Sequence, residues 1–237
     1  MVLPHTYAPS KFQAHKSARR RIAYLHSDDV YDKGETFGRH KSRKADVLHH
    51  IVPSTQPIEN AFDDLAKKLG GDALELLVVN SHGQSSYSII GKGNMTPDKA
   101  VHFKTFRPFF MRASKIAGIE IHSCLFASAV ECWPKKYGWT RENLMLFVDS
   151  VEAMVGMNHL NWKDEDKEAH WTPVKREIGK GTDTMLKIAR AANCPVKAGF
   201  GYQQQDQTGI FDTPWVCARP NGKITFHAAK ISPDLVP

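Results

Sequence analysis

Cysteine is scarce in this chain, and long apolar runs are missing from it. Four cysteines among 237 residues are too few for a disulfide scaffold, and no two of them stand in the CxxC spacing of a zinc knuckle. We therefore expect a reducing compartment in which the thiols are free. No apolar run approaches the ~20 residues of a membrane helix, and the N-terminus has no apolar segment typical of a secretory signal. These features predict a cytoplasmic protein without a membrane partner, although secretion by a non-classical route stays open.

Acidic side chains are outnumbered by basic ones, 25 against 32, which gives a net charge of +7. Much of the excess lies near the N-terminus, and we interpret residues 1–19 as a flexible basic arm. Such a balance favours acidic surfaces, so an acidic partner or activator is one hypothesis. The basic residues carry no recognisable nucleic-acid motif and no interleaved aromatic residues, which argues against binding to DNA or RNA.

The pattern of apolar runs predicts a single α/β domain over residues 20–237. Several short runs are apolar nearly throughout, which is typical of parallel strands that are covered on both faces. Helical patterns lie between them, and this alternation favours a three-layer α/β/α sandwich with a mostly parallel sheet of about six strands. Residues 158–184 are rich in charge and weakly periodic, so we interpret them as a long charged loop. Strands are expected at residues 20–29, 45–54, 74–79, 119–123 and 143–150 and in two C-terminal segments, helices at 54–71, 107–118 and 183–193, and a loop at 91–106.

Two of the predicted strands end in residues that can perform chemistry. One strand runs into the segment Asn80–Gly83, and another runs into His122–Cys124. In an open α/β sheet, ligands bind at the carboxyl ends of the strands. The roughly 40 residues between His82 and Cys124 suffice for one crossover between adjacent parallel strands. We therefore expect these two side chains to approach each other.

This pair supplies the parts that a cysteine nucleophile needs. Cys124 has to be a thiolate to attack a carbonyl carbon, and His82 can take its proton and later protonate the leaving amine. The amide of Gly83 can approach the oxyanion that forms without obstruction by a side chain. Residues 124–136 are expected to start as a helix, and the N-terminal end of that helix favours a thiolate at Cys124. The sequence therefore predicts acyl transfer by a His82–Cys124 dyad.

The same residues resemble the caspase-like (clan CD) cysteine peptidases, a group that includes caspases, metacaspases, gingipains and clostripain. The resemblance rests on the strand that ends in His82-Gly83, the crossover, and the strand that ends in Ser123-Cys124, and it covers roughly residues 20–150. It implies a caspase-like fold and a thiol endopeptidase that hydrolyses peptide bonds in a protein or peptide substrate. It also implies a catalytic His82–Cys124 dyad, an oxyanion site formed by the amides of Gly83 and Cys124, and chemistry that needs no metal or other cofactor.

A pocket for the residue before the cut bond is a further implication of the resemblance. Its expected substrate-binding residues are Asp28, His122 and Ser123. Asp28, at the end of the first strand, could select a basic residue, whereas His122 could disfavour one. Metacaspases typically carry Asp at the position of His122, and neither Arg nor Gly follows Cys124 here. The preferred residue at the cut therefore stays open.

Other interpretations stay open as well. A caspase-like chain can keep the fold, lack activity and serve as a binding protein. The run DVLHHIVPS at 46–54 resembles the opening of an HNH-like metal-dependent nuclease, with Asn60 as its asparagine, but the helix that follows lacks the further histidine that such a site needs. A zinc ion held by His82, His122 and Cys124 has no evident fourth ligand.

Overall fold

A mostly parallel sheet forms the centre of the molecule. The computed structural model describes residues 19–30, 35–84, 87–124, 126–127, 181–199, 208–213, 215–227 and 230–235. In this part of the chain, seven strands form one sheet in the order β2-β1-β3-β6-β7-β8-β9, of which the first five run parallel. The β7–β8 and β8–β9 pairs are antiparallel. The strands are β1 (Arg20–Ser27), β2 (Asp46–Val52), β3 (Ala73–Asn80), β6 (Gly118–His122), β7 (Val196–Gly199), β8 (Trp215–Ala218) and β9 (Ile224–His227).

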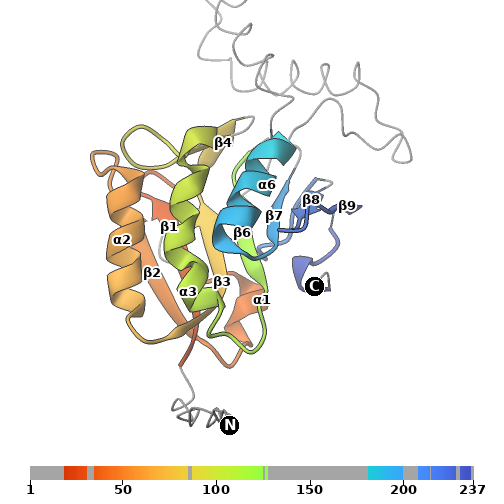
Figure 1. Ribbon diagram of the computed structural model, residues 1–237, viewed down its shortest axis with the longest axis horizontal. Coiled ribbons are helices and arrows are strands. Elements are labelled where there is room, and N and C mark those ends of the chain that lie inside the picture. Colours follow the sequence, from red (N-terminus) through yellow and green to blue (C-terminus); the bar gives the residue numbers. More distant parts are fainter. Residues whose placement is uncertain are drawn as a thin grey trace, which may run out of the picture.

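The longer helices lie together on one face of this sheet (Figure 1). They are α2 (Ile58–Leu69), the 3-10 helix η1 (Pro97–Phe106) with the short α3 (Arg107–Phe110) that continues it, and α6 (Gly181–Ala192). The short helix α1 (Gly38–Lys41) packs against the opposite face, where His40 bonds to the hydroxyl of Tyr24 on β1. Two small elements complete the description: the hairpin of β4 (His82–Gln84) and β5 (Tyr87–Ile89) after β3, and the 3-10 turn η5 (Pro233–Leu235) near the C-terminus.

Helix α2 illustrates how the sequence produces these elements. Its apolar residues recur every three or four positions, so they form one stripe that faces the sheet. The helix ends at Gly70, whose φ of 52° lies in the left-handed region that glycine adopts without strain. The buried residues of the stripe are Ile58, Ala61, Phe62, Leu65 and Leu69.

The central strands are buried on both faces. All eight residues of β3 are buried, and successive side chains point to opposite sides of the sheet. Leu77 and Val79 join the large core beneath the helices, whereas Leu76 and Val78 join a smaller apolar cluster on the other face. Burial on both faces explains why this strand has no alternation of polar and apolar residues.

The α/β class and the mostly parallel sheet that the sequence predicted are confirmed, with seven strands in the described sheet rather than about six. The second of the two expected C-terminal segments forms the hairpin of β8 and β9, with Asn221 and Gly222 in the turn between them. None of the described helices is long and apolar enough to cross a membrane. The strand expected at 143–150 and most of the charged loop at 158–184 lie outside the described residues.

The loop predicted over residues 91–106 is wrong in its second part. Ala100, Phe103 and Phe106 recur every three residues and bury one side of η1, and three residues per turn is the period of a 3-10 helix. The helix predicted over 107–118 is correspondingly short, because the α-helical part ends at Phe110.

We expect Phe62→Ala to lower the free energy of unfolding by about 3–5 kcal/mol, because the ring is almost fully buried. The substitution would remove edge-to-face contacts with Phe103 and Phe106, at centroid distances of 4.8 and 5.0 Å. Urea unfolding measures the change. Val101→Ala is the matched control, because Val101 is 52% exposed on the same helical layer, and its effect should stay below about 0.5 kcal/mol. Equal losses in the two variants would contradict the packing described here.

Candidate active site

The structure brings the strand ends that precede His82 and Cys124 side by side. Strand β3 pairs with β6 in parallel, and Asn80 lies opposite His122 in the register. His82 and Cys124 each follow these paired residues by two positions, so both leave the same edge of the sheet. His82 is exposed, and Cys124 is a half-buried free thiol. Both residues can therefore be reached from solvent.

A close backbone contact joins the two segments just beyond the strands. A methyl group placed on Gly83 would lie 2.5 Å from Ser123 Cβ and 3.2 Å from the amide nitrogen of Cys124. Only glycine leaves room for this approach. The amide of Ser81 also donates to the carbonyl oxygen of His122 at 3.3 Å, which continues the pairing past the end of β3.

Three serines hold this junction from one side of the sheet. The Ser123 hydroxyl lies 2.8 Å from the hydroxyls of both Ser81 and Ser88, and all three residues are buried. Ser123 was expected to line the substrate pocket, but its side chain lies inside this serine cluster. Val79 and Ile121, two residues earlier on each strand, belong to the core under the helices. By alternation, Asn80 and His122, the last residues of β3 and β6, therefore belong to the opposite face. His82 begins the hairpin strand β4, and Cys124 lies in a turn, so the alternation of β3 and β6 does not extend to them.

Asp28 and His122, the other two expected pocket residues, lie at the same edge of the sheet but in different surroundings. Asp28 follows β1 and accepts a hydrogen bond from the amide of Ser54 at 2.8 Å. His122 is buried, and its ring stacks on Phe211 with 4.6 Å between centroids. The His122 Nε2 atom lies 3.3 Å from an oxygen of Glu120. His122 is thus fixed in place from two sides.

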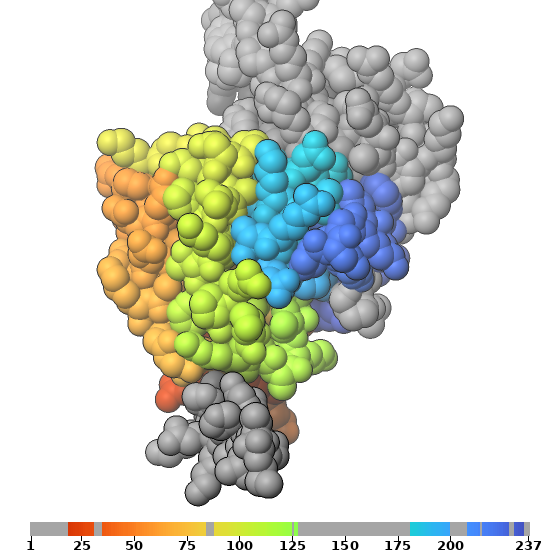
Figure 2. Space-filling view, viewed as in Figure 1, coloured from red at the N-terminus to blue at the C-terminus, as the bar shows by residue number. Residues whose placement is uncertain are grey.

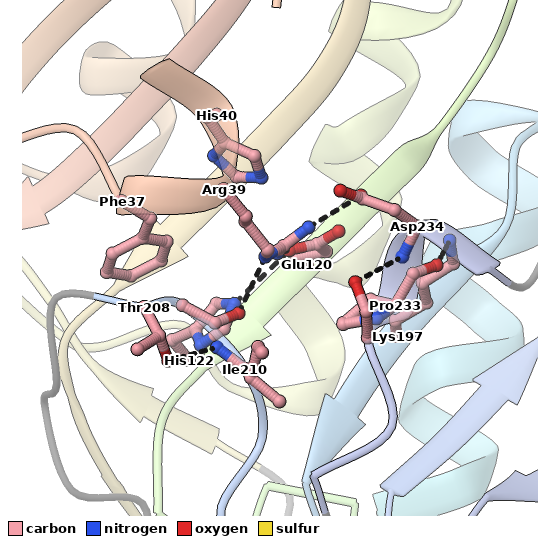
Figure 3. A network of polar contacts seen from close by, with 12 residues as sticks. Phe37, Arg39, His40, Glu120, His122, Lys197, Thr208, Ile210, Pro233 and Asp234 are labelled. Carbon is pink, nitrogen blue, oxygen red and sulfur yellow. Dashed lines mark hydrogen bonds and ion pairs between the residues drawn. The ribbon is translucent and has the colours of Figure 1, made fainter. Parts of the chain in front are cut away.

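Glu120 is the centre of a polar network on this face (Figure 3). The Arg39 guanidinium pairs with Glu120 and, at 2.6 Å, with Asp234, and its Nε donates to the carbonyl oxygen of Gly209 at 2.8 Å. Burial alone would raise the pKa of Glu120, but the guanidinium of Arg39 and the hydrogen bond with His122 outweigh burial and hold that pKa well below its usual range. Glu120 is therefore a carboxylate in the folded protein.

The C-terminal turn η5 closes this network. Arg43 also pairs with Asp234, and the ammonium group of the buried Lys197 donates to the carbonyl oxygen of Pro233 at 2.7 Å. Burial lowers the pKa of Lys197, while Glu120 nearby favours its charged form. Residues from four distant parts of the sequence thus meet on one face of the sheet.

Histidines fill the neighbouring part of the same face. His26 Nε2 lies 3.0 Å from His49 Nδ1, and His26 Nδ1 lies 3.4 Å from the side-chain nitrogen Nδ2 of Asn80. Burial, with the nearby His49, lowers the pKa of His26 to about 4. Burial, with the nearby Arg39, lowers the pKa of His40 to about 3. Both rings are therefore neutral at physiological pH.

No metal has to be invoked for this network. His40, Glu120 and Asp234 offer ligand atoms within 4.8 Å of one another. Arg39 already pairs with both carboxylates, however, so a divalent cation would lie beside a guanidinium. We assign no metal to this cluster.

The two histidines that resemble an HNH motif lie on opposite faces of β2. His49 faces His26, whereas His50 Nδ1 lies 2.9 Å from the ammonium group of Lys68 on α2. Asn60 is an exposed residue of α2. Among the described residues, no group of potential metal ligands includes either histidine or unites His82, His122 and Cys124. This placement gives no support to the nuclease or the zinc interpretation.

Sequence patterns did not identify the Arg39–Glu120–Asp234 network, because its members are 81 and 195 residues apart. One signal was present. Glu120 and Lys197 are single charges within otherwise apolar strands, and a charge that a sheet buries needs a partner. Such residues therefore indicate an ion pair, although the sequence does not say with which residue.

Gly83→Ala tests the close contact between the two segments. The added methyl group would meet Ser123 and the Cys124 backbone, so we expect a loss of about 1–3 kcal/mol of unfolding free energy. Alkylation of Cys124 should change in rate as well, because the substitution displaces its backbone. Gly71→Ala is the matched control, since a methyl group there meets nothing within 4 Å. Similar behaviour of the two variants in urea unfolding and alkylation would refute the contact.

The buried histidines predict a stability that falls in acid. An unfolded chain protonates His40 near its reference pKa of ~6.5, whereas the folded protein does so only near about 3. The unfolded state thus binds more protons between these values, and stability falls by about 1.4 kcal/mol per pH unit per histidine as the pH drops below ~6.5. His40→Gln should reduce this slope in urea unfolding between about pH 5 and 6.5. The partly exposed His102→Gln serves as control, and an equal slope in the wild type and the His40 variant would exclude this coupling.

No model of a known protein family matches this chain, and no curated protein sequence matches it either. The function therefore has to be inferred from the chemistry of the site and from the resemblance of its two strand ends.

Proposed function

We propose that this chain is a caspase-like cysteine endopeptidase in which His82 and Cys124 form the catalytic dyad. One observation carries the proposal: adjacent parallel strands deliver the two residues to one edge of the sheet, each two positions beyond the register pair Asn80–His122. Neighbouring strands are about 4.8 Å apart, so side chains that leave them on one face come within reach of a shared substrate.

The acylation step follows from these two groups. His82 takes the proton of Cys124, and the thiolate attacks the carbonyl carbon of a peptide bond to form a tetrahedral intermediate. The intermediate collapses, the carbon–nitrogen bond breaks, and His82 gives its proton to the leaving amine. The product is a thioester between Cys124 and the N-terminal part of the substrate.

Water completes the cycle. His82 removes a proton from a water molecule, whose oxygen attacks the thioester carbon. The carbon–sulfur bond breaks, the carboxylic acid leaves, and the Cys124 thiol is restored. The histidine thus acts in turn as base and acid, and no oxidant, metal or cofactor is consumed.

The approach of Gly83 to Cys124 supports an oxyanion site at the same place. The position that a methyl group would occupy on Gly83 is 3.2 Å from the Cys124 amide nitrogen. This contact brings the two segments together, and the amides of Gly83 and Cys124 on them are the proposed donors to the developing negative charge. The serine cluster of Ser81, Ser88 and Ser123 fixes the segments that carry these amides, so the donors are positioned before the substrate binds.

The detailed architecture of the fold and the cellular location belong to the same proposal. We propose a three-layer caspase-like sandwich over residues 20–237 that acts on a protein or peptide in the cytoplasm. In support, helices cover one face of the sheet, while α1 and η5 lie against the other. Asp28 and His122 flank the dyad at the same edge and are the candidates for selecting the residue before the cut bond.

Thiol reactivity tests the dyad without knowledge of the substrate. We expect low concentrations of iodoacetamide to modify Cys124 at least about 100-fold faster than Cys194 and Cys217, and at a pH well below the reference pKa of ~8.5. Burial raises the pKa of both Cys194 and Cys217, which makes them internal standards for an unreactive thiol. Mass spectrometry of peptides across the pH range measures the three rates.

His82→Ala should shift the pH profile of Cys124 alkylation, and His102→Ala, on the surface of η1, should leave it unchanged. A peptide library would then reveal the cleaved sequence, and Cys124→Ser should abolish that cleavage. An unreactive Cys124, or a profile that ignores His82, would contradict the proposal and favour the catalytically inactive binding protein.

A further inference from the structure

The segment from Lys99 to Ala117 concentrates two kinds of exposed side chain. It contains no acidic residue. Three of the five exposed large apolar side chains in the described part of the chain lie in it, namely Val101 (52% exposed), Met111 (69%) and Ile116 (38%). A single exposed apolar residue is ordinary, but three within one cationic segment call for an explanation.

Helical geometry places several of these residues in one line. Val101, Lys104 and Arg107 follow at intervals of three, which the 3-10 helix η1 stacks on one side. Met111 follows Arg107 by four residues, the interval that α3 stacks on the same side. The opposite side of η1 is the buried one, with Phe103 and Phe106 in the core. We call the exposed line, together with Lys115 and Ile116, the 101–116 ridge.

The cations of this ridge are not used to hold the fold. No carboxylate of the described residues pairs with Lys104, Arg107 or Lys115, all of which are exposed. Lys99, by contrast, pairs with Glu59 of α2, and Arg112 lies over the ring of Phe109 at 5.2 Å. These three cations, which pair with no carboxylate in the described part of the chain, are therefore candidates to bind an external anion.

The ridge lies on the outer surface of the helical layer. Figure 2 shows the segment, in yellow-green to green, on the near side of the molecule between α2 (orange) and α6 (cyan). Such a line of exposed apolar and cationic side chains can enter a deformable surface, with apolar tips inserted and cationic groups among anionic headgroups.

We propose that the 101–116 ridge docks this protein on an anionic lipid surface as a peripheral contact. Val101, Met111 and Ile116 would enter the boundary of the acyl chains, and Lys104, Arg107 and Lys115 would pair with lipid phosphates. The proposal does not depend on the peptidase activity, because it uses none of the residues of that site.

Sedimentation with vesicles tests the ridge in the full-length chain. We expect binding to vesicles of phosphatidylcholine with phosphatidylglycerol, weaker binding at higher salt, and none to phosphatidylcholine alone. The triple variant Lys104→Gln, Arg107→Gln, Lys115→Gln should bind about 100-fold more weakly, at about fivefold per charge. Met111→Gln leaves the three cations of the ridge in place and should still bind at least about threefold more weakly than the wild type.

Two control variants, each lacking three cations outside the ridge, test whether vesicle binding depends on the ridge or only on the net positive charge of the protein. Lys44→Gln, Lys92→Gln, Lys223→Gln removes three exposed cations elsewhere on the surface, and Lys11→Gln, Lys16→Gln, Arg19→Gln removes three from the N-terminal arm. Each should weaken binding by less than about fivefold. Loss of binding in the arm variant with full binding of the ridge variant would overturn the proposal. So would the absence of binding to phosphatidylglycerol, which would leave an acidic protein as the partner for these cations.

Discussion

A carboxylate buried in the middle of a sheet is the constraint around which one whole face of this molecule is arranged. Glu120 is fully buried on β6, and a charge in such a place is stable only when it is paired. Arg39 provides the pairing charge from α1, which connects β1 to β2. In the sheet, β3 lies between β1 and the strand β6 that carries Glu120. The polypeptide can bury Glu120 only if α1 folds over this face. One ion pair thus links the position of a helix to the position of a strand.

The same pair explains why the C-terminal turn lies where it does. A single guanidinium spans Glu120 and Asp234, and Lys197 of β7 donates to the carbonyl oxygen of Pro233, so side chains hold η5 to the sheet without a strand of its own. Removal of one partner from a buried pair typically costs about 3–5 kcal/mol, because the other charge is left unpaired. The side chain of Glu120 in turn contacts the His122 ring and holds it in place, and Cys124 follows two residues later. The candidate nucleophile therefore stands on a strand end that a long-range ion pair has already fixed.

The sequence predicted what depends on local patterns and on neighbouring strands. The unbroken apolar run of β3 indicated a strand that is covered on both faces, because residue type reveals burial directly. The residues that follow β3 and β6 are polar or reactive and marked the carboxyl ends of the two strands. The network around Glu120 stayed hidden, since pairing over 81 residues leaves no periodic trace. The 3-10 helix was missed for another reason: the glycines and Pro97 in residues 91–106 suggested a loop, although Pro97 is at the first turn of η1.

The two surfaces for which functions are proposed lie in different parts of the molecule. His82 and Cys124 follow the carboxyl ends of β3 and β6, at one edge of the sheet. The 101–116 ridge lies on the outside of the helical layer. A lipid surface bound to the ridge would therefore leave the edge with His82 and Cys124 open to a substrate. The two proposals share no residue, so a lipid surface on the ridge would occupy neither member of the proposed dyad.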